Sequence, residues 1–426
     1  MKRLVAFFFL LGPVGAAAEE SAERTFTIAQ SVQVALQNNQ ALLSAREGVR
    51  IATQRIAEAR SLIWPSLAVN LNASRYRTED HAVLAAESGS TLLPPSFNGE
   101  ADNYYSGRLA LRQVLYNGGR TMANTRLAQA ALAQARIREE EIRRRVTVDV
   151  TGAFYGELLA RKQLALSEEA QRDLQALSAS LPLSDGAARA VLEGVRARLR
   201  RAQSERRREE ERASLTFLST LGLELYTRVS LQGDLSAAPL RPDLAKLLAR
   251  AQESRLEIRG TEYQREMDRL AVNLTEAERY PVVALMAGYE VNDRAFPLDQ
   301  NFWNATLNVS LPLFDGFASR ARIRQTRIAA NQSRIERAAI EDKIAMEVRS
   351  AHADLTYWQD EAAARRDDWD RLRELYARLP AGRDPVQKGQ ARLELLSAAQ
   401  TYWDAVHGQL IARARLENAV GLPLDP

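Results

Sequence analysis

Few side chains in this sequence have the types and spacing that enzyme chemistry requires. The three histidines, His81, His352 and His407, are scattered and form no ligand pair at helical spacing, and the chain has no cysteine. A metal site is therefore not expected, and thiolate ligands, cysteine nucleophiles and disulfides are excluded. The sequence also contains no nucleophile–base pair and no phosphate-binding loop. We expect no cofactor and no enzymatic activity.

A basic stretch from Arg196 to Arg212 is the strongest local charge feature, and its arginines alternate with glutamates. Such mixing is typical of a solvated helix face with ion pairs one turn apart. The formal net charge of the whole chain is only +4. We therefore expect no nucleic-acid partner.

Four segments alternate between apolar and polar residues, as half-buried strands do. The predicted strands cover residues 66–76, 104–114, 282–291 and 302–313. Each is close to the roughly 9–11 residues that a tilted strand needs to cross a bilayer. The alternation puts Arg108, Arg112 and Glu290 on the polar side of these strands. A soluble antiparallel sheet with one solvated face would show the same alternation.

Aromatic residues at the strand ends favour the membrane over the soluble sheet. Those near the flanking helices are Trp64, Tyr116, Tyr280 and Phe314, and those near the connecting loops are Tyr76, Tyr104, Tyr105, Phe302 and Trp303. Amphipathic rings settle at the headgroup level of a bilayer, so two aromatic girdles are typical of an outer-membrane barrel. Four strands cannot close such a barrel, because the smallest known have about eight. The predicted barrel must therefore be shared, with eight strands in two copies or twelve in three.

The strands belong to a sequence repeat. Leu109–Gly118 reappears as Leu307–Gly316, and Trp64-Pro65 reappears as Tyr280-Pro281. The offset is 216 residues before the strand pair and 198 after it, so the halves differ mainly between the two strands, within about residues 77–102. We predict a first repeat over 19–235 and a second over 236–426.

The rest of the chain shows helical periodicity with small, alanine-rich apolar faces. Long helices are predicted over about 120–179 and 319–379, return helices over 187–218 and 392–418, and pairing helices over 27–62 and 244–278. At 1.5 Å per residue each long helix would extend about 90 Å. The predicted fold is mainly α with a small β part.

The first residues are typical of a secretory signal. Lys2 and Arg3 precede the apolar run Leu4–Leu11, and Ala16–Ala18 resembles a cleavage site. We expect residues 1–18 to be removed and the mature chain to be exported.

A strand pair between long helices, duplicated behind a signal peptide, resembles the TolC family of outer-membrane channels. The resemblance covers about residues 25–424 and rests on Trp64-Pro65, Tyr280-Pro281, Leu115–Arg120, Leu313–Gly316, Lys388–Ala398 and Ala419–Leu422. It implies a homotrimer with a twelve-stranded outer-membrane barrel and a helical tunnel through the periplasm. It further implies docking, through a periplasmic adaptor, on the inner-membrane transporter of a tripartite efflux pump or a type I secretion system.

The resemblance makes the two helix turns the expected gate and adaptor-docking tip. The residues concerned are Asp185, Gly186, Arg189, Arg383, Asp384, Lys388, Gly389 and Arg392. Opposite charges at a constriction can hold it closed, although Gly, Pro and Asp also end helices without any gating role. The first turn lacks the family's aromatic residue before its glycine, and the second carries an added Pro-Ala-Gly-Arg-Asp-Pro run. These departures leave the mode of adaptor contact open.

Within the implied barrel, strand parity directs Arg108, Arg112 and Glu290 into the lumen, or alternatively to interfaces between subunits. The expected function is a passive exit duct for small molecules or proteins. A periplasmic coiled-coil adaptor or scaffold without a barrel is the alternative, and a stand-alone porin is disfavoured by the long helices. The sequence does not identify the cargo.

Overall fold

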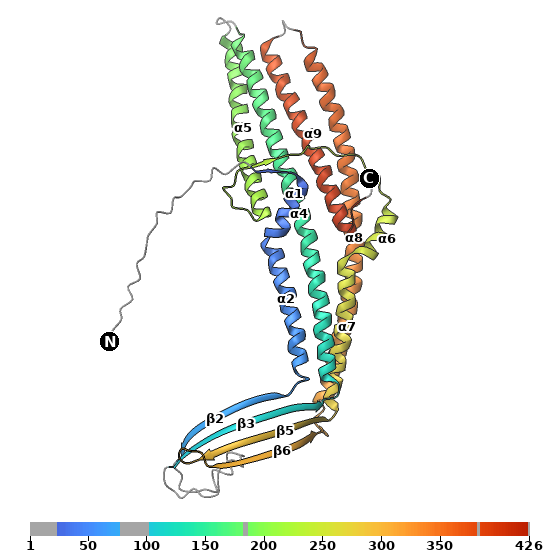
Figure 1. The fold of residues 1–426 in the computed structure, drawn as a ribbon. Coiled ribbons are helices and arrows are strands. Elements are labelled where there is room, and N and C mark those ends of the chain that lie inside the picture. Colours follow the sequence, from blue (N-terminus) through green and yellow to red (C-terminus); the bar gives the residue numbers. More distant parts are fainter. Residues whose placement is uncertain (1–23, 77–101, 182–185, 381–383, 425–426) are drawn as a thin grey trace, which may run out of the picture. The chain divides into compact units, whose positions relative to one another are not determined.

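The protein is predominantly helical with a small sheet, as the sequence predicts. The computed structural model describes residues 24–76, 102–181, 186–380 and 384–424. Long helices and one four-stranded sheet make up most of this part of the chain (Figure 1). The predicted signal peptide lies outside the described residues. Among the described helices, none is both long and apolar enough to cross a bilayer.

Apart from one short 3-10 turn, the described elements of the two halves of the chain follow the same order. The first half contains β1 (Arg24–Phe26), α1 (Ile28–Asn38), α2 (Gln40–Ser61), β2 (Ser66–Tyr76), β3 (Asp102–Tyr116), α4 (Arg120–Ala179) and α5 (Gly186–Leu221). The second contains β4 (Val229–Leu231), α6 (Leu244–Ser254), α7 (Leu256–Glu276), the 3-10 turn η1 (Ala277–Arg279), β5 (Val282–Asp293), β6 (Gln300–Ser310), α8 (Ala318–Ala377) and α9 (Pro385–Val420). Helices α4 and α8 have 60 residues each, and α5 and α9 have 36 each.

Both predicted pairing helices are interrupted at equivalent positions. Asn39 has an extended backbone, and its side-chain oxygen accepts hydrogen bonds from the amides of Ala41 and Leu42. It therefore ends α1 and caps α2 at once. Arg255 is also extended and separates α6 from α7. The continuous helices predicted over 27–62 and 244–278 are therefore wrong, because periodicity alone does not detect a single extended residue.

The sheet is antiparallel with the strand order β2-β3-β5-β6. The first predicted strand matches β2, whereas β3 and β5 run two residues or so further than predicted. Strand β6 ends at Ser310 rather than at residue 313. Pro312 follows closely and has no N–H to donate to a neighbouring strand, which fits this earlier end.

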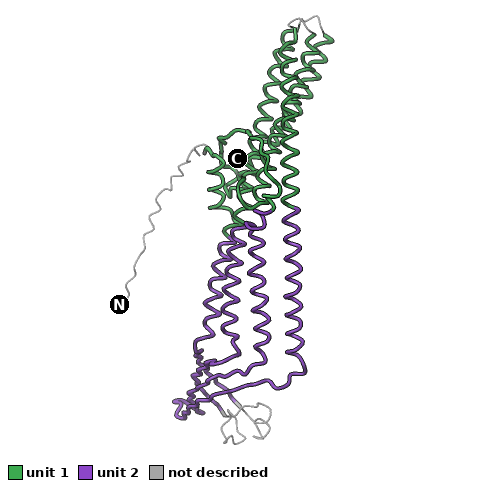
Figure 2. Tube along the Cα trace, turned by 90° about the vertical axis from the view of Figure 1, so that its right-hand side faces the viewer, with its two compact units in different colours: residues 1–43, 142–248, 347–426 green, residues 44–141, 249–346 purple. Residues whose placement is uncertain are grey.

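The described chain forms two compact units, and each takes segments from both halves (Figure 2). One unit, the bundle unit, comprises residues up to Leu43, 142–248 and 347–426. The other, the sheet unit, comprises residues 44–141 and 249–346. Neither half of the chain by itself is one of these compact units.

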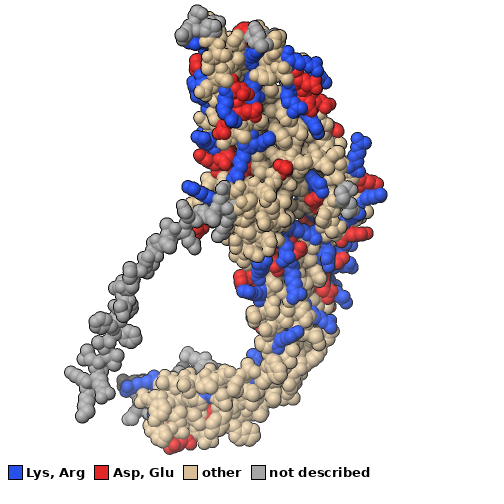
Figure 3. All heavy atoms as spheres, turned by 45° about the horizontal axis from the view of Figure 1, so that its top comes forward, with Lys and Arg blue, Asp and Glu red and all other residues tan. Residues whose placement is uncertain are grey.

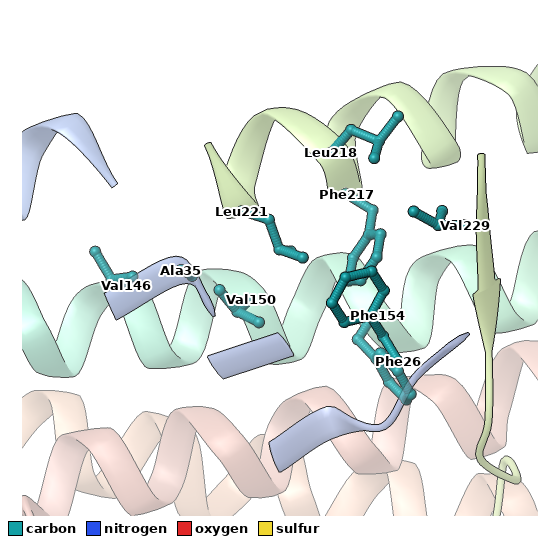
Figure 4. Close-up of a cluster of buried hydrophobic side chains, with 9 residues drawn as sticks. All are labelled: Phe26, Ala35, Val146, Val150, Phe154, Phe217, Leu218, Leu221 and Val229. Carbon is teal, nitrogen blue, oxygen red and sulfur yellow. The ribbon is translucent and has the colours of Figure 1, made fainter. Parts of the chain in front are cut away.

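The bundle unit has a core where the short parallel pair β1–β4 meets the helices. Phe26 and Phe154 both contact the ring of Phe217 edge-on, at centroid distances of 6.4 and 6.1 Å (Figure 4). Glu157, one turn beyond Phe154 on α4, is fully buried beside Arg161. Burial raises the pKa of the Glu157 carboxyl, and the positive charge of Arg161 offsets only part of this rise.

The helices of the sheet unit lie in the same order as its strands. Helix α2 contacts α4 through Arg46 and Glu139, whose side chains are 3.6 Å apart. Helix α4 contacts α7 through Gln134 and Gln264, joined by a hydrogen bond of 3.3 Å. The hydroxyl groups of Thr275 and Thr326 link α7 to α8 at 3.2 Å. The layer order α2-α4-α7-α8 thus parallels β2-β3-β5-β6.

Candidate functional site

One side of the sheet is a continuous apolar face. Strand register places Leu109 opposite Val69 and Tyr289, and it places Trp303 on the far side of Tyr289. The apolar face consists of Leu67, Val69, Leu71, Leu109, Leu285, Tyr289, Trp303, Leu307 and Val309. All of them are exposed, and Leu71 at the middle of β2 has 79% of its surface open. Figure 3 shows the sheet largely free of Lys, Arg, Asp and Glu.

The opposite side is a polar face. Its members are Ser66, Asn70, Asn72, Ser74, Ser106, Arg108, Arg112, Glu290, Asn304, Thr306 and Asn308. The three charged residues that the sequence singles out therefore share one face of the sheet. Arg112, near the end of its strand, pairs with Ser66 and Met286 before the register shifts.

Arg108 and Glu290 form a cross-strand ion pair on the polar face. The Arg108 Nε and Glu290 Oε2 atoms are 4.0 Å apart, and Glu290 is only 4% exposed. Gly288 leaves room for the Asn304 side chain beside this pair, because an added Cβ there would lie 2.7 Å from Asn304 Oδ1, whereas its 3.5 Å distance to Arg108 Nε would be an ordinary contact. The pairing fixes a positive and a negative group side by side on this face.

The aromatic residues expected in the girdles fall into two groups. Trp64, Tyr116, Tyr280, Phe314 and Trp303 are exposed. A β-bulge between Val114 and Tyr116 turns Tyr116 to the apolar side, opposite Val283. A bulge shifts parity by one residue, and counting along the sequence would have placed this ring on the polar face.

The aromatic residues at the loop ends of the strands do not all share the apolar face. Tyr104 is buried opposite Ser74, and Phe302 lies opposite Glu290, so both belong to the polar side. Tyr105 contacts the ring of Phe296 at 4.9 Å. Tyr76 is the last residue of β2.

Phe317, which the sequence pattern did not single out, lies next to Phe314 at the start of α8. Their rings meet edge-on at 5.5 Å, and both are exposed. Phe317 has a left-handed backbone with φ of 68°, where the first half has Gly119 with φ of 82°. A non-glycine residue in that region costs roughly 1 kcal/mol or more. The sequence could have singled out Phe317, because aligning the two halves places it at the position of Gly119, where the backbone is left-handed.

Arg392 is the most deeply buried of the predicted tip residues that carry a charge and that the structure describes. It is 7% exposed and joins α9 to α4 through Asp173, at 2.6 Å, and Glu169, at 3.0 Å. Burial raises the pKa of the Tyr376 hydroxyl on α8, and the charge of Arg392 opposes that rise. Arg392 therefore links α9 of the second half to α4 of the first half.

The other tip residues take local roles. Asp384 caps α9 by accepting the amide of Val386, and the amide of Lys388 donates to its carbonyl. Arg189 donates to the carbonyl of Leu181 at 2.8 Å, and Gly186 begins α5. Asp185 and Arg383 lie outside the described residues.

Gly389 marks a close approach of α9 to the first half. An added Cβ would lie 2.6 Å from Leu192 Cδ2 and 3.4 Å from Leu174 Cδ2. The glycine lets α9 approach both α4 and α5. The tip sequence thus combines tight packing with the ion pairs that the buried Arg392 makes to two half-exposed carboxylates.

The faces of the sheet are suited to separating two media rather than to catalysis. One face is apolar and open, and the other carries amides, hydroxyls and an ion pair. In the part of the chain that the structure describes, no three His, Asp or Glu side chains are grouped to hold a metal ion.

Known proteins match most of the chain. The outer membrane efflux protein BepC of Brucella suis biovar 1 (strain 1330) is 26% identical over 384 residues, which cover 86% of this chain and 77% of BepC. CyaE of Bordetella pertussis (strain Tohama I) is 27% identical over 319 residues, which cover 70% of this chain and 62% of CyaE.

The fold matches that of a solved channel. The crystal structure of the open state of the MtrE outer membrane channel of Neisseria gonorrhoeae superposes with a TM-score of 0.75 at 16% identity, covering 93% of this chain and 89% of MtrE. The model of the OEP family, described as outer membrane efflux protein, matches residues 31–216 and 247–422. The resemblance to the TolC family is confirmed, and the chain belongs to the outer membrane efflux protein family.

Proposed function

We propose that three copies of this outer-membrane efflux protein complete one twelve-stranded barrel and form a passive exit duct. The apolar face of each sheet would contact lipid, and the polar face would line the lumen. The observation that carries the proposal is the exposure of the apolar face in a single chain. A soluble sheet would bury this face and expose the other.

The free-energy cost of leaving the apolar face in water supports lipid as its occupant. Nine large apolar side chains are exposed there. Burying such a side chain is worth about 1.5–3 kcal/mol, so leaving these partly exposed in water costs on the order of 10 kcal/mol. That is comparable with the whole stability of a typical domain. The face therefore needs a permanent apolar environment.

The polar face suits a water-filled lumen with little selectivity. Asn, Ser and Thr side chains offer hydrogen bonds of both kinds, and the charge of Arg108 is balanced by Glu290, which leaves Arg112 as the unbalanced charge among these three residues. Such a wall is hydrated and offers many weak contacts, so it does not bind one cargo tightly. We infer that cargo is selected by a partner transporter, and that this chain is no enzyme.

The helices would continue the duct into the periplasm, with the turns after α4 and α8 as the far tip. An adaptor and an inner-membrane transporter of a tripartite pump or a type I secretion system would dock there. Arg392 is buried and pairs with Glu169 and Asp173, so it is a candidate for holding the tip closed. Lys388 and Asp384 lie closer to the turn and are more exposed, which suits contact with an adaptor.

We also infer that the two halves arose by duplication of one unit. The equal lengths of α4 and α8, and of α5 and α9, support this. The alternative of a periplasmic scaffold without a barrel is not favoured, since it would leave the apolar face in water.

Fractionation and transport together test the duct. The protein is expected to stay in the outer-membrane pellet after carbonate extraction, to need detergent for release, and to have the mass of a trimer in detergent. Cells without it should retain an efflux dye that complemented cells expel. Release by carbonate would support the scaffold and refute the barrel.

The tip is tested separately. Deleting residues 381–383 is expected to abolish dye export without lowering the amount of protein in the outer membrane. Export that survives this deletion would refute a docking role for the tip and leave the barrel proposal standing.

A further inference from the structure

The polar face of the sheet carries few charges, and they lie on its two inner strands. Among the strand residues whose side chains the structure describes, the charged members of this face are Arg108 and Arg112 on β3 and Glu290 on β5. Asn, Ser and Thr supply most of the other polar side chains. Two arginines against one glutamate leave one excess positive charge in each chain.

Arg108 and Glu290 balance each other, whereas Arg112 has no such partner. Arg108 Nε lies 4.0 Å from Glu290 Oε2. Arg112 lies opposite Ser66 and Met286, which are both neutral, and no carboxylate of the described residues forms an ion pair with it. Glu290 is opposite a residue four positions along β3, so it is about 13 Å away at the usual rise of a strand. Since the screening length is about 10 Å at 0.1 M salt, the charge of Arg112 stays unbalanced.

The three charged side chains also differ in how far they reach the surface. The side chain of Glu290 is 5% exposed and that of Arg108 is 39% exposed. Arg112 is exposed as well. A solute that passes over the polar face therefore meets guanidinium groups rather than the carboxylate.

The position of Arg112 within the sheet favours the lumen over an interface between subunits. Strand β3 pairs with β2 on one side and with β5 on the other, so it is not an edge strand. Arg112 is near the end of β3 that leads into α4 (Figure 1). In the proposed barrel it would therefore face the lumen, close to the point where the duct continues into the helices.

The second half of the chain shows that the strand does not require these arginines. With the repeat offset of 198 residues, the counterparts of Arg108 and Arg112 are Thr306 and Ser310 on β6. Both are neutral, and β6 still pairs with β5 along its whole length. The arginines of β3 are therefore free to serve the solute that passes rather than the fold.

We propose that Arg112 gives the barrel lumen a net positive charge, so that the duct passes anions more readily than cations of the same size. Three copies would bring three such guanidinium groups to one level of the barrel. Rings of arginine or lysine select anions in pores, because like charges on a low-dielectric wall raise the local concentration of the opposite ion.

The favoured cargo is a solute that carries a carboxylate, sulfate or phosphate group. The inference rests on the proposed duct and adds to it a preference for one sign of charge. The choice among anionic solutes stays with the partner transporter.

The ion selectivity of the full-length protein in planar lipid bilayers measures this preference. The current–voltage relation in a KCl gradient gives the permeability ratio of chloride to potassium. Arg112→Gln should lower this ratio by about two- to fivefold near 0.1 M salt, because screening leaves part of the field of each charge. The effect should shrink at 1 M KCl, where the screening length is about 3 Å. Glu290→Gln leaves Arg108 unbalanced and should raise the ratio.

Two further variants separate the charge from damage to the structure. Arg112→Lys keeps the positive charge and should keep the ratio of the unchanged protein. Arg75→Gln removes an arginine from the other side of the sheet, because Arg75 shares its side of β2 with Leu71. This variant should leave the ratio unchanged.

The natural absence of cysteine allows the charge to be exchanged within a single variant. Arg112→Cys is treated in the bilayer with a methanethiosulfonate reagent that carries either a trimethylammonium or a sulfonate group. The cationic reagent should restore the ratio of the unchanged protein, and the anionic reagent should lower the ratio further. Equal effects of the two reagents would place the side chain outside the conducting path and overturn the inference.

The outcomes distinguish the role of Arg112 from the duct itself. If the protein conducts but Arg112→Gln shifts the ratio no more than Arg75→Gln does, the role of Arg112 is wrong and the duct stands. If the detergent-released protein is a monomer and gives no channel in the bilayer, the duct and this inference fail together.

Discussion

Replacing Leu71 with arginine would put a charge at the middle of the apolar face. Leu71 is the central residue of β2 and is the most open member of that face. An arginine on the lipid side of a barrel strand costs about 2–4 kcal/mol at the bilayer midplane. Because about 1.4 kcal/mol is a factor of ten, the equilibrium constant between folded and unfolded protein should fall by roughly 30- to 700-fold per copy.

Asn72→Arg is the matched control, since Asn72 is the next residue and lies on the polar face opposite Ser106. Its only described side-chain bond is a long one of 3.4 Å to Ser106 Oγ. We expect this charge to stay hydrated in the lumen and to cost less than about 1 kcal/mol, the range found away from the lipid-exposed midplane.

Urea titration of the protein folded into phospholipid vesicles, followed by tryptophan fluorescence, measures the difference. The Leu71→Arg midpoint should fall well below that of the unchanged protein, and the Asn72→Arg midpoint should stay near it. Equal losses in the two variants, or a larger loss for Asn72→Arg, would refute the assignment of the faces.

Four other substitutions probe the bundle unit. Gly389→Ala should destabilise the protein by about 1–3 kcal/mol through overpacking. Gly194→Ala on α5 should stabilise it by about 0.5–1 kcal/mol, because no atom lies within 4 Å of the added Cβ. Thermal unfolding followed by circular dichroism compares the two variants. Arg392→Met should cost about 1–3 kcal/mol through its lost charged hydrogen bonds, less than a fully buried pair because its carboxylate partners are half-exposed, and the same thermal unfolding measures this loss. Burial raises the pKa of the Glu157 carboxyl above its usual 4.5 in the folded protein. The stability that this group contributes is therefore full below pH 4.5 and is lost as the pH rises through the folded pKa. Denaturant titrations across pH 4–8 should show a smaller fall in the free energy of unfolding for Glu157→Gln than for the unchanged protein, and an equal fall would contradict this reasoning.

The sequence predicts the strands and long helices well because each has an uninterrupted period. Strand β2 and helix α4 begin and end where the pattern predicts. The failures occur where one residue changes the geometry. The bulge after Val114 redirects Tyr116, and Asn39 and Arg255 interrupt helices whose apolar period continues across them.

The candidate site is predicted only in part, for a different reason. Residue parity is local, so the shared face of Arg108, Arg112 and Glu290 follows from the sequence. The burial of Arg392 does not, because its partners Asp173 and Glu169 lie more than 200 positions away in the chain. Such contacts depend on how the two halves pack, which periodicity does not encode.

The open apolar face also constrains how the protein is made. If the proposed barrel forms, the chain exposes this face and two unpaired strand edges to water until lipid and neighbouring copies cover them. Exposed edges of this kind are templates for aggregation. The yield of correctly folded protein should therefore fall as the concentration of the chain rises.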